Sequence, residues 1–127
     1  MIQAPVREPD AICKLRLPKG AALNSRIHWG KRAAQTRSDR QYAAMAGSLI
    51  EAKVLGKAVV QITWHGRGRL PDLDNIAGRC KAYIDGLSDA PGWWHDDADI
   101  VWLSASRERI AKGEDPHVYI RAWEATP

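Results

Sequence analysis

Apolar and polar residues alternate with two different periods along this chain of 127 residues. Residues 12–18, ICKLRLP, alternate apolar with basic side chains, and residues 57–65, 100–106 and 117–123 are rich in β-branched and aromatic side chains. A period of two and this composition are typical of β-strands. The pattern therefore predicts four strands, separated by stretches of a different character.

The first of the longer stretches has a helical period. Residues 31–53 are rich in good helix formers, and Tyr42, Met45, Leu49 and Ala52 fall at helical spacing. Apolar residues that recur every three to four positions share one face of a helix. We therefore predict a helix over residues 31–53 that buries this face.

A second helix is predicted to begin at Asp72 or Asp74, either of which can cap it, and to end near Leu87. Its apolar stripe consists of Leu73, Ile76, Ala77, Cys80, Ile84 and Leu87. The predicted order is thus β-α-β-α-β-β, typical of an α+β fold in which a mixed β-sheet is covered by two helices. At this length we expect residues 1–127 to form one domain, with residues 1–10 as a loose arm.

Charge and cysteine content narrow the class of protein. The chain has 19 Lys and Arg against 15 Asp and Glu, a net charge of +4, which mildly favours polyanions as partners. An apolar share of 45% argues against wholesale disorder. The two cysteines form no CxxC pair, and neither a secretory segment nor a membrane-length apolar run occurs. These features predict a reduced, cytoplasmic protein.

Two acidic clusters stand out in this basic chain. PDLDN carries Asp72 and Asp74 directly after a predicted strand and turn, and HDDAD at residues 95–99 precedes another predicted strand. Helix capping explains one aspartate of the first cluster, and a solvated loop can explain the second cluster. In extended backbone, however, residues i and i+2 point the same way, and several carboxylates together provide the hard oxygen ligands that Mg²⁺ prefers.

Between the two clusters, the second predicted helix carries one lysine. Lys81 lies seven residues after Asp74 and four before Asp85, so the three share one line of the helix surface. An ion pair between Lys81 and Asp85 on a wet face is the simpler interpretation, worth at most about 0.5 kcal/mol. The other is an ammonium that contacts a phosphate undergoing cleavage.

The ordered set PDLDN, a lysine-bearing helix ending in DGL, and WWHDDADI resembles the RusA-type Holliday-junction resolvases, small endonucleases of phages and prophages. The likeness covers residues 69–103, and LNSRIHWGKRAAQTR extends it over most of the chain. It implies an α+β homodimer that cuts four-way DNA junctions by Mg²⁺-dependent hydrolysis, with Mn²⁺ as a substitute. It also implies the cytoplasm of a bacterial host, with no membrane and no small-molecule cofactor.

The resemblance assigns a role to individual residues of this chain. By this resemblance, Asp72, Asp74 and Asp97 match the metal-binding catalytic carboxylates, and Asp96 matches a less certain neighbour. The family lysine lies four residues after the second aspartate, where this chain has a glycine. Counting back from DGL instead places Lys81 in register as the fourth catalytic residue. Lys81 can take this role only if the helix begins later or its axis shifts.

An acidic centre repels DNA, so phosphate contacts must come from other residues. The candidates for DNA binding are Arg26, Lys31, Arg32, Arg37, Arg40, Arg67 and Arg69. Trp93 and Trp94 can stack on an unpaired base, although core or interface packing is the favoured interpretation. Two other functions stay open: a non-catalytic nucleic-acid-binding module of this fold, and a metal-dependent nuclease of other branched or single-stranded DNA.

Overall fold

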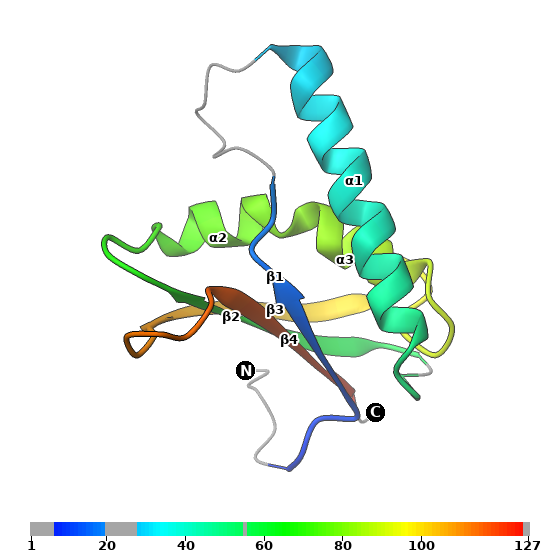
Figure 1. Cartoon of the computed structure of the whole chain (residues 1–127). Coiled ribbons are helices and arrows are strands. Elements are labelled where there is room, and N and C mark those ends of the chain that lie inside the picture. Colours follow the sequence, from blue (N-terminus) through cyan, green and yellow to red (C-terminus); the bar gives the residue numbers. More distant parts are fainter. Residues whose placement is uncertain (1–6, 20–27, 55, 126–127) are drawn as a thin grey trace.

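A computed structural model of the chain describes residues 7–19, 28–54 and 56–125, and its elements are shown in Figure 1. In chain order they are β1 (Ala11–Arg16), α1 (Trp29–Ser48), β2 (Ala58–Gly66), α2 (Leu73–Arg79), α3 (Lys81–Ser88), the 3₁₀ turn η1 (Asp97–Asp99), β3 (Ile100–Arg109) and β4 (His117–Glu124). The four strands lie within three residues of the predicted ranges. The expected α+β class is confirmed.

The strands form one mixed sheet in the order β1-β4-β2-β3. β4 pairs antiparallel with both β1 and β2, whereas β2 and β3 run parallel. The helices lie on one face of this sheet (Figure 1). Parallel neighbours need a crossover connection, and α2 and α3 supply it between β2 and β3.

The predicted order β-α-β-α-β-β is wrong at the second helix, which is two helices, α2 and α3. Cys80 ends α2 and precedes α3, with φ −91° and ψ 1°. Ile76 and Ile84, on the two sides of this break, are both buried. A break in the axis lets both halves bury their apolar faces against a sheet that twists beneath them. Tertiary packing therefore overrides the continuous helical period of the sequence.

The core lies between the sheet and the helices. It includes both members of the tryptophan pair, since Trp93 is 4% exposed and Trp94 is 0% exposed. Their indole N–H groups donate to backbone oxygens of Gly47, at 3.1 Å, and Ile84, at 3.3 Å. The favoured packing interpretation is confirmed in its core form, because side chains this buried cannot stack on a nucleobase.

The predicted buried face of the first helix is wrong at Met45 and Leu49, while Tyr42 and Ala52 are partly buried against the core. Met45 and Leu49 are 62% and 84% exposed, while α1 buries Ala43, Gly47 and Asp39. The reason is the close crossing of α1 over α3, which leaves room only for small side chains. At Gly86 of the DGL motif, an added Cβ would lie 2.3 Å from the backbone oxygen of Arg40.

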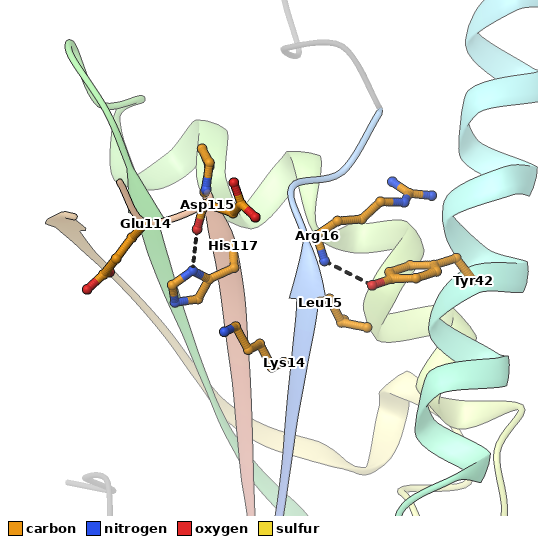
Figure 2. Close-up of a pocket in the computed structure, with 8 residues that line it drawn as sticks. Lys14, Leu15, Arg16, Tyr42, Glu114, Asp115 and His117 are labelled. Atoms are coloured by element: carbon orange, nitrogen blue, oxygen red, sulfur yellow. Dashed lines mark hydrogen bonds between the residues drawn. The ribbon is translucent and has the colours of Figure 1, made fainter. Parts of the chain in front are cut away.

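A buried carboxylate joins β1 to α1. Asp39 is fully buried and accepts hydrogen bonds from the Arg16 guanidinium, at 3.2 Å, and from the Lys19 backbone N–H, at 3.0 Å. The Arg16 backbone N–H also donates to the Tyr42 hydroxyl at 3.0 Å (Figure 2). A buried charge with such partners holds its neighbours in register. No helix in the described part of the chain is long and apolar enough to cross a membrane.

Gly86→Ala tests the helix crossing. We expect it to lower the free energy of unfolding by about 2 kcal/mol, because the added methyl meets backbone that cannot move aside. Gly47→Ala is the matched control, since its closest neighbour is the end of the Leu87 side chain, which can shift. Urea denaturation of both variants measures the difference. Equal losses would contradict the proposed role of the Arg40 backbone at this crossing.

Candidate functional site

The parallel pairing of β2 with β3 decides where the two acidic clusters lie. Asp72 follows the carboxyl end of β2, and the second cluster immediately precedes the amino end of β3. In a parallel pair these positions lie at opposite ends of the two strands. At about 3.3 Å per residue, the 10 residues of β3 cover roughly 33 Å. The two clusters are therefore separated by most of the length of β3.

The first cluster forms neither of the arrangements expected from sequence. Asp72 occupies the N-cap position of α2, but its side chain makes no capping hydrogen bond. Leu73 is already helical, so Asp72 and Asp74 do not have the extended backbone that would point their side chains the same way. The Asp72 side chain is 81% exposed, and its Oδ1 lies 3.7 Å from Arg107 Nη1. Its partner among the described residues is thus an arginine of β3.

Lys81 joins the second cluster. It is the first residue of α3, and its Nζ lies 2.6 Å from Asp85 Oδ1 and 3.0 Å from Asp97 Oδ2. α3 begins at Lys81, directly after the break at Cys80, whereas the sequence predicted one continuous helix here. The ion pair with Asp85 that the simpler interpretation predicts is confirmed, and Lys81 also reaches a motif aspartate from another element. Contact of Lys81 with a phosphate stays a prediction.

The charges in this cluster stabilise one another. Hydrogen bonds to the Asp85 and Asp97 carboxylates raise the pKa of Lys81 above its usual value. The pKa of Asp97 is lowered, first by the hydrogen bond from Lys81 and then by one with Asp96. Lys81 and Asp97 are consequently both charged at neutral pH. Their side chains are 55% and 57% exposed, so a solvent-borne ligand can reach them.

The remaining acids of the second cluster have structural partners. Asp96 precedes η1, and its carboxylate accepts a hydrogen bond from the Ala98 backbone N–H at 3.1 Å. Asp99 pairs with Lys57 at 3.2 Å, just before β2. The contact between Asp96 and the Ala98 N–H lies within the turn that presents Asp97 to Lys81, whereas Asp99 pairs away from Lys81.

The proposed metal ligands do not form one site here. Within residues 7–19, 28–54 and 56–125, no three His, Cys, Asp or Glu side chains lie close enough together to hold a metal ion. Carboxylates are suitable donors for Mg²⁺, but Asp72, Asp74 and Asp97 do not surround one position. The residues fit the ion in donor chemistry and not in geometry. Magnesium binding therefore stays a prediction.

The seven proposed DNA-binding cations occupy different parts of the molecule. Arg26 lies outside the described residues. Lys31, Arg32 and Arg37 are exposed on α1, whose first turns rise away from the sheet (Figure 1). Arg40 donates two hydrogen bonds to the Asp89 carboxylate, at 2.8 and 3.0 Å, which occupy one edge of its guanidinium.

The last two candidates lie in the loop after β2. Arg67 donates to the backbone oxygen of Glu114 in the loop before β4. Arg69 lines a pocket of about 430 Å³ whose other lining residues are Leu70, Asp72, Arg107 and Arg109. Sequence reasoning missed both β3 arginines. Their spacing of two was the available signal, but only the parallel pairing places them beside the PDLDN segment.

Comparison with known proteins adds little about function. No protein-family model matches the chain. An uncharacterised protein of Xylella fastidiosa is 36% identical in an alignment of 80 residues, and the match covers 58% of this chain. The match spans 52% of that protein, about half of its length.

Lys81→Met tests the electrostatic coupling in the second cluster. Removing the ammonium should raise the pKa of Asp97 toward its ordinary value of about 3.9, because its main stabilising hydrogen bond is lost. A depressed carboxyl pKa stabilises the fold above the unfolded-state pKa, and this contribution disappears as pH falls through the folded-state pKa. The variant should therefore lose less stability on acidification.

Carbon-detected NMR titration of the Asp97 carboxyl measures this shift. Lys57→Met is the matched control, because it removes an ammonium that pairs with the neighbouring Asp99. The control should leave the pKa of Asp97 close to its wild-type value. An unchanged Asp97 pKa in Lys81→Met would show that the contact does not persist in solution.

Proposed function

We propose that this chain is a Mg²⁺-dependent, structure-selective DNA endonuclease that resolves four-way junctions as a homodimer. The observation that carries the proposal is the 3.0 Å contact between Lys81 Nζ and Asp97 Oδ2. These residues belong to separate parts of the ordered resolvase-like pattern and lie sixteen positions apart. The cytoplasm of a bacterial host, with phage or prophage origin, is part of the same proposal.

The chemistry of the contact supports a reaction at phosphate. A charged ammonium that is partly exposed can approach a phosphate oxygen and stabilise the negative charge that develops during hydrolysis. The neighbouring Asp97 is ionised, as a carboxylate ligand or base requires. An isolated surface ion pair would account for Lys81 and Asp85 alone. The third partner, held on the turn before β3, is what favours a functional cluster.

A non-catalytic nucleic-acid-binding module is the second candidate. It is favoured by the separation of Asp72 from Asp97, since the described residues assemble no three-carboxylate group. In this alternative the acids hold turns and helix ends, and the basic surface binds DNA without cutting it. A nuclease of other branched or single-stranded DNA shares the cluster with the first proposal and differs in substrate.

Asp97→Asn separates the catalytic from the non-catalytic candidate. We expect cleavage of a synthetic four-way junction in Mg²⁺ to fall at least about 100-fold, because a charged ligand of the reaction centre is lost. Junction binding should survive, since removing a negative charge does not weaken attraction to phosphate. Gel assays in Mg²⁺, in Mn²⁺ and in chelator measure cleavage and binding together.

Asp99→Asn is the matched control, because Asp99 lies two residues from Asp97, pairs with Lys57 and matches no catalytic position of the resolvase-like pattern. It should retain wild-type cleavage. Undiminished cutting by Asp97→Asn would refute the catalytic assignment, and binding without cutting by the wild-type chain would support the module. The same gel with flap, duplex and single-stranded DNA tests selectivity, and sedimentation of the wild-type chain tests the homodimer.

A further inference from the structure

Three arginines lie close together at the carboxyl ends of β2 and β3, away from Lys81 and Asp97. Arg69 comes from the loop after β2, and Arg107 and Arg109 come from the end of β3. Together with Leu70 and Asp72 they line a pocket of about 430 Å³, named here the arginine pocket. All three guanidinium groups belong to exposed residues. The pocket is therefore open to a ligand from solvent.

Strand register explains why the β3 arginines face the same way. Arg107 pairs with Trp64 of β2, and Arg109 pairs with Gly66. Residues two apart on a strand share a face, and Trp64 is buried on the face that the helices cover. Gly66 has no side chain beside Arg109. At this end of the sheet, the helix-covered face therefore carries Arg107, Arg109 and the loop that contains Asp72.

One hydrogen bond orients the Arg107 guanidinium, and its other N–H groups can still donate to a ligand. Arg107 Nη1 donates to the backbone oxygen of Pro71 at 2.9 Å and lies 3.7 Å from Asp72. A guanidinium carries five N–H donors in a planar fork, so most remain available to another acceptor. The Pro71 contact orients the group in advance, which lowers the entropy cost of binding.

The charge balance selects the class of ligand. Three arginines against the single carboxylate of Asp72 give the pocket a formal charge of +2. That carboxylate is 81% exposed and stands at a distance of 3.7 Å from Arg107, so it does not occupy the whole guanidinium edge. Forked guanidinium groups match the paired oxygens of phosphate. The pocket suits an anion with several oxygens rather than a cation or an apolar group.

We propose that the arginine pocket binds a phosphate group of a nucleic-acid backbone. The choice of nucleic acid as the ligand rests on the function proposed above, whereas the anion site rests on the geometry of the pocket. Arg107 and Arg109 join Arg69 as DNA-binding residues. Phosphate is held at the carboxyl ends of β2 and β3, away from the contact between Lys81 and Asp97.

Arg109→Gln tests the site in the full-length chain. Binding to a short fluorescent duplex is measured by anisotropy across a salt series in chelator, so that cleavage plays no part. We expect affinity at low salt to fall about tenfold, and the slope of log K against log salt to fall by about 0.9 for one lost phosphate contact. Arg107→Gln should produce a similar change.

Lys53→Gln is the matched control. It removes one exposed cation from the segment after α1, beside Val54, whose backbone N–H bonds to Gly92. Its salt slope should equal that of the wild-type chain. Equal slopes in Arg109→Gln, Lys53→Gln and the wild type would overturn the proposal. If Arg107→Gln unfolds through loss of its contact to Pro71, the solvent-facing Arg109 variant still decides the outcome.

Competition separates the two sources of phosphate. Inorganic phosphate, added at constant ionic strength, should displace the duplex from the wild-type chain and have less effect on Arg109→Gln. Displacement that is identical in both proteins would place the anion elsewhere. Phosphate binding that depends on Arg109 while duplex affinity does not would assign the pocket to a free anion and reject the nucleic-acid backbone. Loss of junction cleavage by Asp97→Asn has no bearing on these binding results.

Discussion

The parallel pairing of β2 with β3 is the constraint on which the rest of this structure depends. Two parallel neighbours cannot be joined by a tight turn, so the chain must return along the length of the sheet before β3 begins. Here α2 and α3 make that return, bury their apolar side and meet α1 across a crossing that Gly86 keeps close. Asp72, Lys81 and Asp97 all lie on this crossover.

This crossover separates two kinds of electrostatic environment. Its beginning lies at the carboxyl ends of β2 and β3, where three arginines outnumber the carboxylate of Asp72. Its end lies before β3, where carboxylates outnumber the ammonium groups of Lys81 and Lys57. The break at Cys80 lies between the two, and Lys81, which directly follows it, contacts Asp97.

Local periodicity was sufficient to predict the strands, the presence of helix after β1 and after β2, and the α+β class, because these depend on short-range sequence patterns. Contacts between elements were not predictable in the same way. Met45 and Leu49 have helical spacing and are exposed, since the crossing with α3 accepts only small residues such as Ala43 and Gly47. The arginines of β3 gained their importance from a parallel register that no local pattern encodes.

The aspartates of residues 69–75, RLPDLDN, suggest a metal site when only the sequence is considered, but the structure places one of them beside an arginine. As a motif the segment suggests a cation held between Asp72 and Asp74, but the described contact of Asp72 is to Arg107. A carboxylate beside an arginine-rich pocket lowers the positive charge there and leaves the guanidinium groups partly oriented. Such a site can bind and release a polyanion, whereas three unopposed arginines would hold it more tightly. If both proposals hold, one end of the crossover binds the DNA backbone and the other carries the reactive cluster.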